Sequence, residues 1–236
     1  MKEKLKEISK EINIDLNEEQ LDKFKKYMDL LLEWNEKINL TAITEEDEVI
    51  LKHFVDSMTV LKYIDNGASI VDVGTGAGFP GIPVSIAKDS VNVILVDSLN
   101  KRINFLQEVI SQIDLKNIKA IHSRAEEFGQ NKEHREKYDI SVSRAVANLS
   151  VLVEYLLPLV KVGGKCICMK GSEVEEELTN AKFAIKELGG KVEVVDEFCL
   201  PGTDIKRNII VIRKEKETPK KYPRKSGTPS KQPLKK

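Results

Sequence analysis

Seven short apolar runs constrain the fold of this chain more than any other feature of its sequence. Amphipathic segments separate the first six runs, and such strand–helix alternation predicts a mostly parallel sheet with helices on both faces. Only about eight residues, centred on PGTD, separate the last two runs. That connection is too short for a parallel crossover, so the last two strands should be an antiparallel pair. The runs are residues 69–73, 91–97, 118–123, 138–143, 165–170, 191–200 and 208–213, and the helical segments are residues 80–88, 99–113, 124–129, 148–162 and 173–188.

The chain before the first run predicts helices. Asn17 followed by Gln20 is a capping-box pattern, and apolar residues recur behind it at helical spacing. Thr44 and Asp47 make a similar start for a second helical segment. We therefore expect an N-terminal helical extension over residues 1–66, packed on the core, a main α/β domain over residues 67–213, and a tail over residues 214–236.

The tail is rich in Lys, Pro, Ser and Gly and has few apolar residues, so it should be disordered on its own. From Arg213 to Lys236 there are ten Lys or Arg and two Glu, a net charge of 10 − 2 = +8, which leaves −8 on the other 212 residues. A basic tail on an acidic body favours a polyanionic partner. Tyr222 can stack on a base in that setting. A simple solubilising tail is the alternative.

The stretch VDVGTGAGFP, residues 71–80, places three glycines directly behind the first run. Residues 76–81 match G-x-G-x-x-G, in which a dinucleotide pyrophosphate sits on a helix N-terminus. Residues 71–78 also match apolar–acid–apolar–G-x-G-x-G, which is typical of an S-adenosylmethionine pocket. Asp72 favours the second interpretation, because a carboxylate repels a pyrophosphate but attracts the ammonium of the adenosylmethionine amino-acid group. An NAD-dependent oxidoreductase is the alternative.

The terminal antiparallel pair also fits the methyltransferase version of the fold. We therefore predict a class I S-adenosylmethionine-dependent methyltransferase. It should have a Rossmann-like, mostly parallel seven-stranded sheet with a terminal antiparallel strand, plus the N-terminal helical extension. Asp97, at the end of the second run, can hold a ribose hydroxyl in either interpretation.

Several features bear on compartment and partners. There is no apolar run of the length of a membrane span, and the segment MKEKLKEISKEI lacks the apolar core of a signal peptide. The three cysteines are odd in number and lie in apolar runs, which indicates reduced thiols. We expect a cytoplasmic protein, a monomer, with no membrane partner and no metal site.

Seven motifs together resemble the RsmG family, also called GidB, of bacterial methyltransferases that act on 16S ribosomal RNA. The resemblance runs in order through nearly the whole chain, and it implies transfer of a methyl group from adenosylmethionine to N7 of a guanine in that RNA. It also implies the small ribosomal subunit or its RNA as the partner. The motifs are LTAIT (40–44), HFVDS (53–57), VDVGTGAGFPGIP (71–83), VDSLNKR (96–102), SRAEEF (123–128), VSRAVANL (142–149) and KKYPRKSGTP (220–229).

The resemblance also implies cofactor contacts at Gly74, Phe79, Ala125, Glu126 and Arg144. All five follow the carboxyl ends of predicted strands, where ligands of open α/β sheets bind. Gly74 would allow close backbone approach, Phe79 would give apolar cover, and Ala125 and Glu126 would lie at the adenine edge. Arg144 would bind the cofactor carboxylate or a substrate phosphate. A solvated helix start is the alternative for Glu126, and a purely structural role is the alternative for Arg144.

No catalytic residue can be assigned from the sequence. Guanine N7 carries a bare lone pair in the major-groove edge and needs no deprotonation, so no general base is required. His53 and Asp56 are three residues apart and can touch on one helical face. We interpret them as a hydrogen-bonded pair that joins the N-terminal helices to the core, rather than as acid–base catalysts. A non-catalytic RNA-binding protein that retains the pocket is a third functional hypothesis.

Overall fold

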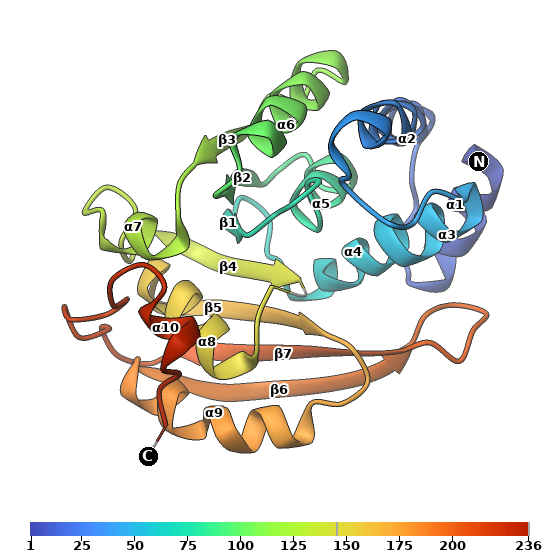
Figure 1. Cartoon of the computed structure of the whole chain (residues 1–236). Coiled ribbons are helices and arrows are strands. Elements are labelled where there is room, and N and C mark those ends of the chain that lie inside the picture. Colours follow the sequence, from blue (N-terminus) through green and yellow to red (C-terminus); the bar gives the residue numbers. More distant parts are fainter. Residues whose placement is uncertain (145, 236) are drawn as a thin grey trace.

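The computed structural model describes residues 1–144 and 146–235. Over these residues, one seven-stranded sheet has the order β3-β2-β1-β4-β5-β7-β6 (Figure 1). The strands pair in parallel except β7, which runs antiparallel to β5 and to β6. The predicted sheet and its antiparallel last strand are confirmed. The strands are β1 (Ser69–Val73), β2 (Asn92–Asp97), β3 (Ile118–His122), β4 (Tyr138–Arg144), β5 (Val160–Lys170), β6 (Gly190–Cys199) and β7 (Lys206–Lys214).

Helices cover both faces of the sheet. The main ones before β4 are α1 (Lys2–Glu11), α2 (Glu18–Ile38), α5 (Gly81–Ala87), α6 (Asn100–Gln112) and α7 (Ala125–Gln130), and those after it are α8 (Leu149–Leu156), α9 (Glu175–Glu187) and α10 (Thr228–Lys231). Between α2 and β1 the chain forms α3 (Glu46–Val49), the π-helical turn η1 (Ile50–Val55), α4 (Asp56–Met58) and the 3₁₀ turn η2 (Thr59–Tyr63), and η3 (Leu157–Leu159) joins α8 to β5.

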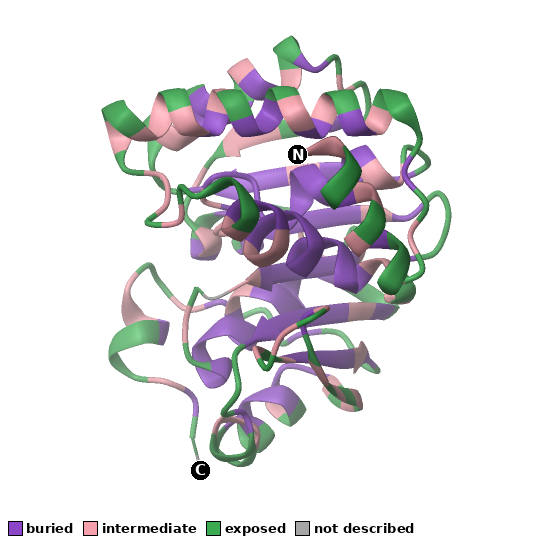
Figure 2. Cartoon of the chain, turned by 90° about the vertical axis from the view of Figure 1, so that its right-hand side faces the viewer, coloured by how far each residue is buried: buried purple, intermediate pink, exposed green. Residues whose placement is uncertain are grey.

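Two hydrophobic clusters fill the space between the sheet and its helices. The first joins β1 through Ile70 to α2, α5 and α6, and the second joins β1 through Val71 and Val73 to α7, α8 and α9. Successive strand residues point to opposite faces, so Ile70 and Asp72 share one side of β1 while Val71 and Val73 share the other. The buried residues of both clusters form the interior seen in Figure 2.

The capping box predicted at α2 is present and also joins α2 to the core. Asn17 Oδ1 accepts a hydrogen bond from the Gln20 backbone N–H at 2.9 Å, and Gln20 Oε1 accepts one from the Asn17 N–H at 3.0 Å. Gln20 Nε2 donates to the Ile86 carbonyl at 3.0 Å, at the end of α5. The Gln20 side chain therefore takes part in the N-terminal cap of α2. It also fixes the position of α2 against α5.

The structure differs from the sequence prediction between the fourth and fifth strands. A helix was expected over residues 148–162, but α8 ends at Leu156, η3 covers the next three residues, and β5 begins at Val160. Pro158 lies within η3. Proline tolerates the first turn of a short helix but interrupts a longer one, because its ring clashes with the preceding turn.

The tail also differs from the prediction. Residues 214–235 do not lie apart from the body but follow a defined path along α7, α8 and α9, and Tyr222 is buried. Its cations pair with carboxylates of the acidic body: Lys214 with Glu136 at 3.1 Å, Lys221 with Glu187 at 3.1 Å, and Arg224 with Glu154 at 2.7 Å.

The tail is ordered because residues of the body supply its apolar and polar contacts. The Tyr222 ring joins the second hydrophobic cluster, and its hydroxyl donates to Glu187 at 3.2 Å, so this ring is not free to stack on a base. Arg135 donates to the carbonyl oxygens of Thr218 at 2.8 Å and Tyr222 at 2.6 Å. Composition predicts disorder for the isolated segment, whereas the body supplies the apolar surface and counter-charges that hold it.

Within the described residues, none of the helices combines the length and the apolar character needed to cross a membrane.

Candidate cofactor site

The glycine turn after β1 has a backbone that only glycine adopts without strain. Gly74, Gly76 and Gly78 have φ angles of +69°, +62° and +101°. A Cβ atom on Gly74 would lie 2.6 Å from Cγ2 of Val146, which follows β4. The turn is held to β2 because the Gly74 N–H donates to the Val96 carbonyl at 2.8 Å. Gly74 therefore combines a left-handed backbone with close packing.

Asp72 has a role different from the one that the sequence predicted. It lies on the α5 side of β1, is fully buried, and does not line the cavity described below. Its Oδ2 accepts hydrogen bonds from Thr75 Oγ1 at 2.7 Å and from the Gly81 N–H at 2.8 Å. The expected pairing of Asp72 with the cofactor ammonium is therefore wrong, because the strand turns this carboxylate toward the helix. It fixes the glycine turn and the first turn of α5.

This use of Asp72 also bears on the dinucleotide alternative. In a dinucleotide fold the N–H groups at the start of the helix bind the pyrophosphate. Here the Gly81 N–H, at the first residue of α5, is bound to a buried carboxylate. A pyrophosphate at this position would have to displace the Asp72 carboxyl group from the Gly81 N–H, so the residues present do not suit it.

The buried state of Asp72 predicts a specific pH dependence of stability. Burial, partly opposed by the Thr75 and Gly81 hydrogen bonds, raises the pKa of Asp72 to about 7. Between the unfolded value near 4 and pH 7 the folded protein retains a proton that the unfolded chain has lost, so this carboxyl destabilises the fold as the pH rises through that window. We expect the melting temperature of Asp72→Asn, relative to wild type, to increase from pH 4 to pH 7 and to level off above it. Thermal unfolding at several pH values measures this difference, and a difference independent of pH would contradict the prediction.

A cavity of about 580 Å³ opens at the carboxyl ends of β1, β2, β3 and β4. All six residues predicted for the cofactor site line it, although they are spread over some seventy positions of the chain. This is the position at which open α/β sheets bind ligands, since the loops diverge where the strand order reverses between β1 and β4. The residues are Gly74, Phe79, Asp97, Ala125, Glu126 and Arg144.

Asp97 ends β2 and joins the glycine turn to the cavity wall. Its Oδ2 accepts from the Gly76 N–H at 2.9 Å and from Arg102 Nη1 at 3.3 Å, while Oδ1 accepts from the Leu99 N–H at 2.9 Å. An ionised carboxylate has about four acceptor positions, so capacity remains for one further donor from the cavity. A ribose hydroxyl is such a donor.

Ala125 and Glu126 begin α7, directly after β3. The Glu126 side chain is buried, and its Oε1 accepts a hydrogen bond from the Gly227 N–H at 2.8 Å. A solvated helix start is thus not the role of this carboxylate in the structure. The contact with Gly227 was not predicted, because it joins residues 101 positions apart.

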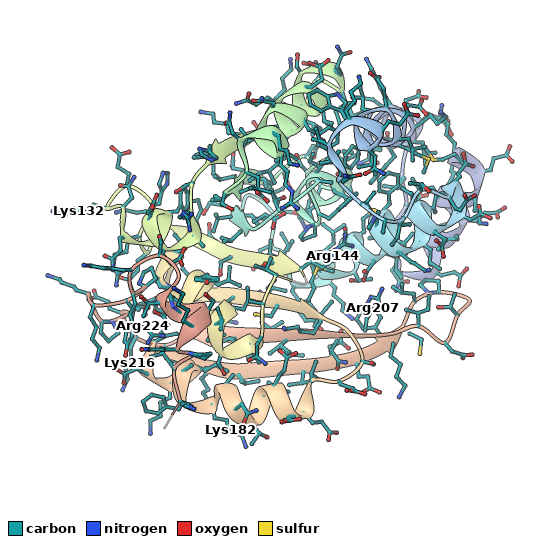
Figure 3. All side chains as sticks on the ribbon, in the orientation of Figure 1. Lys132, Arg144, Lys182, Arg207, Lys216 and Arg224 are labelled. Carbon is teal, nitrogen blue, oxygen red and sulfur yellow. The ribbon has the colours of Figure 1, made fainter. Side chains whose placement is uncertain are left out.

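Arg144 connects the end of β4 to the N-terminal helices (Figure 3). Its Nη1 donates to the Lys52 carbonyl at 3.1 Å and to Asp56 Oδ2 at 3.3 Å, and its Nη2 lies 3.1 Å from His53 Nδ1. The guanidinium carbon lies 4.9 Å from the centre of the Phe79 ring. Arg144 therefore lines the cavity and also holds its wall together.

His53 and Asp56 do not form the predicted pair. Each of them bonds to Arg144, and Asp56 Oδ2 also accepts from Arg207 Nε at 3.1 Å. The His53 ring stacks on Phe79 with centres 4.4 Å apart, and its Nε2 lies 2.8 Å from Thr41 Oγ1. Both residues do join the N-terminal helices to the core, through Arg144 rather than through each other.

The environment of His53 excludes it as a proton donor near neutral pH. Burial and the nearby Arg144 cation lower the pKa of His53 to about 3. A neutral ring whose Nδ1 accepts from Arg144 carries its proton on Nε2, where Thr41 Oγ1 accepts it. His53 thus orients Arg144 and the segment around Thr41 without changing its charge.

Sequence reasoning missed several residues of the cavity. Tyr155 of α8 and the tail residues Gly227 and Ser230 line it, although none of them follows a strand. Thr41 and Val146 also line it, and both lie inside motifs quoted for the family resemblance. That position in a motif was the available signal for Thr41 and Val146, and Gly227 likewise lies inside the motif KKYPRKSGTP, whereas the place of Ser230 depends on how the tail packs.

The lining of the cavity is compatible with an adenosylmethionine molecule. The glycine turn brings a backbone without side chains to the cavity, Asp97 has one acceptor position left, and Phe79 presents an apolar ring. Gly74 and Arg144 approach the cavity from β1 and β4, while Ala125 and Glu126 approach it from β3. This placement suits an elongated ligand whose charged end lies toward Arg144 and whose aromatic end lies toward Ala125 and Glu126.

Comparisons with known proteins agree with this arrangement. The family model GidB, rRNA small subunit methyltransferase G, matches residues 20–210. A protein of Acetivibrio thermocellus named ribosomal RNA small subunit methyltransferase G is 58% identical over 222 residues, which cover 94% of this chain and 91% of that protein. A protein of the same name from Alkaliphilus oremlandii is 52% identical and covers 100% of this chain and 99% of its own length.

Solved structures share the fold at low sequence identity. A SAM-dependent methyltransferase from Aquifex aeolicus superposes with a TM-score of 0.53 at 18% identity, covering 71% of this chain and 93% of its own. TYW2 from M. jannaschii in complex with AdoMet gives a TM-score of 0.53 at 16% identity, covering 67% of this chain and 74% of its own. These likenesses establish the fold and no more.

Proposed function

The chain belongs to the GidB family, rRNA small subunit methyltransferase G, and from that premise we propose that it methylates N7 of a guanine in 16S ribosomal RNA. It is an S-adenosylmethionine-dependent rRNA methyltransferase. The observation that carries the proposal is the cavity at the carboxyl edge of the sheet, where the glycine turn, Asp97 and the start of α7 meet around one space. The assignment of individual residues to the cofactor is part of the proposal.

The residues are proposed to bind the cofactor from two ends. Gly74 and Phe79 would meet its central part, Asp97 its ribose, and Ala125 and Glu126 its adenine, with the Glu126 carboxylate held by the tail. Arg144 would face the methionine end or the RNA. When bound, adenosylmethionine supplies an electrophilic methyl group on its sulfonium.

The protein would act mainly by positioning and by exclusion of water. Guanine N7 has a free lone pair, so no side chain must remove a proton before the attack. His53, the titratable ring nearest Arg144, is neutral and occupied by Thr41 and Arg144. Aligning the two reacting atoms is itself a large source of rate acceleration, and the packed wall formed by His53, Phe79 and Arg144 would contribute to it.

The proposed RNA substrate also indicates the cellular compartment of the protein. A protein that methylates ribosomal RNA would act where ribosomal subunits are assembled, so we place it in the cytoplasm. We propose that it acts as a monomer on the RNA or on the small subunit.

Transfer of labelled methyl groups tests the proposal. Ribosomal RNA from a strain lacking this activity, incubated with the protein and methyl-labelled adenosylmethionine, should acquire label that elutes as 7-methylguanosine after nucleoside digestion. Label in another nucleoside would contradict the N7 assignment. RNA binding without methyl transfer would identify a non-catalytic RNA-binding protein.

A thermal-shift measurement separates the two cofactor classes. S-adenosylhomocysteine should raise the melting temperature, because a ligand that binds only the folded state stabilises it, and NADH should not. A shift with NADH alone would favour the oxidoreductase.

A further inference from the structure

The C-terminal segment forms part of the wall of the cavity, although neither the glycine motif nor the strand order requires it. Gly227 and Ser230 line the cavity together with Tyr155 of α8. In Figure 1, α10 lies beside α8, on the same side of the sheet as α7. The tail therefore reaches the end of the cavity at which Ala125 and Glu126 begin α7.

An ion pair with a buried carboxylate fastens the segment just before it reaches the cavity. Arg224 Nε donates to Glu154 Oε1 at 2.9 Å and Nη2 donates to Oε2 at 2.7 Å, which is a two-pronged contact. The backbone N–H of Arg224 also donates to Oε1 at 2.8 Å. The Glu154 side chain is 0% exposed, so removing Arg224 leaves a carboxylate without its counter-charge.

A second tie lies at the cavity itself. The Gly227 N–H donates to Glu126 Oε1 at 2.8 Å, and the Ser226 hydroxyl lies 3.4 Å from Glu127 Oε1. Gly227 has a φ of +81°, a conformation that other residues rarely adopt. Gly227 therefore lies where the tail turns toward Glu126, at the end of the cavity proposed for adenine.

We propose that residues 224–230 are a component of the cofactor site, in which Arg224 is a positioning residue that holds Gly227 and Ser230 against the adenosine part of S-adenosylmethionine. This inference rests on the proposed function, since it requires that cofactor in the cavity. The tail is thus a wall of the adenosine pocket rather than only a basic arm. If the ligand contacts the docked tail, the docked tail increases the affinity for the ligand. The bound ligand then stabilises the docking of the tail on the body by the same factor.

Affinities for two ligands test the role of Arg224 in the full-length protein. S-adenosylhomocysteine contains the whole cofactor skeleton, and 5′-methylthioadenosine contains only its adenosine end. We expect Arg224→Ala to weaken both by the same factor of about tenfold, within the usual range of coupling between sites. Arg224→Lys should restore part of the affinity, because one ammonium cannot reproduce the two-pronged contact.

Lys221→Ala is the matched control. Lys221 is also a tail cation paired with a body carboxylate, Glu187, but its side chain is 64% exposed and it does not line the cavity. We expect this variant to bind both ligands as the wild type does. Equal loss in Lys221→Ala and Arg224→Ala would show a general effect of tail charge and would overturn the inference.

Ser230→Trp provides a test that does not depend on the ion pair. Ser230 is exposed and lines the cavity, so an indole there should leave the fold intact and block the adenosine end. We expect at least about tenfold weaker binding of both ligands, because the indole would occupy space at the adenosine end of the cavity. Unchanged affinity in this folded variant would overturn the inference, even if Arg224→Ala failed to fold.

Two further outcomes are distinguishable. Wild-type protein that binds neither ligand contradicts the proposed function itself. Wild-type protein that binds both, with variants that lose affinity only for ribosomal RNA, would show that the tail is an RNA-binding arm and would overturn the inference alone.

Discussion

The Gly74→Val variant is expected to fold and to have lost measurable binding of S-adenosylhomocysteine, with a decrease in affinity of at least about 100-fold, the cost of about 3 kcal/mol of steric conflict. Gly74 has a φ of +69°, and its added Cβ would lie 2.6 Å from Val146 Cγ2, at the wall of the cavity. The two further methyl groups of valine would crowd the part of the cavity that we propose binds the ligand. Isothermal titration calorimetry gives the affinity, and circular dichroism reports the fold.

Gly202→Val separates the effect on the cavity from the effect of backbone strain. Gly202 has a φ of +67°, almost the same as Gly74, but nothing lies within 4 Å of the position of its Cβ. Both variants should lose about 1–3 kcal/mol of stability through backbone strain, and Gly74→Val should lose more because of its contact with Val146. Only Gly74→Val should lose the ligand. Normal affinity in a folded Gly74→Val protein would remove Gly74 from the site.

Arg144→Ala is expected to lower kcat/KM for methyl transfer by about 100-fold, the scale of a small misplacement of reacting groups. The substitution removes a cation that lines the cavity and also leaves His53 Nδ1 without its donor. Phe79 loses the guanidinium that lies 4.9 Å from its ring centre. Arg144→Lys should recover only part of the activity, because one ammonium nitrogen cannot take the place of both Nη1, which binds Asp56 and the Lys52 carbonyl, and Nη2, which lies against His53.

Arg207→Ala is the matched control for Arg144. Arg207 binds the same Asp56 oxygen at 3.1 Å, but it does not line the cavity. Assays below both melting temperatures should show kcat/KM within a few-fold of wild type for Arg207→Ala. An equal loss in both variants would show that the Asp56 ion pairs maintain the fold and that Arg144 has no further role. Full activity in Arg144→Ala would identify a structural arginine.

The features that depend on short stretches of chain were predictable. The alternation of apolar runs and amphipathic segments determines a parallel sheet, and the short PGTD connection determines the antiparallel last strand. The capping box at Asn17 and Gln20 forms as predicted, because both partners are three residues apart. The six residues proposed for the site share one cavity because each of them follows a strand end or the glycine turn, and parallel strands bring such ends to one edge.

The partners of charged side chains were not predictable in the same way. Asp72 alternates onto the α5 face of its strand, so its carboxylate binds Thr75 and Gly81 and not the ligand. Arg144 finds its acceptors on residues about ninety positions earlier, and these come near only when the N-terminal helices pack on the sheet.

The tail shows most clearly the difference between what local sequence predicts and what the tertiary structure decides. By itself the sequence determined that residues 214–236 carry a large positive excess and too little apolar surface to fold alone. Only the tertiary structure placed the buried Glu154 opposite Arg224 and Glu126 opposite Gly227. Periodicity and turn chemistry act over a few residues and can be recognised in a sequence, whereas a carboxylate 70 positions away becomes a partner only after folding has brought the two segments together.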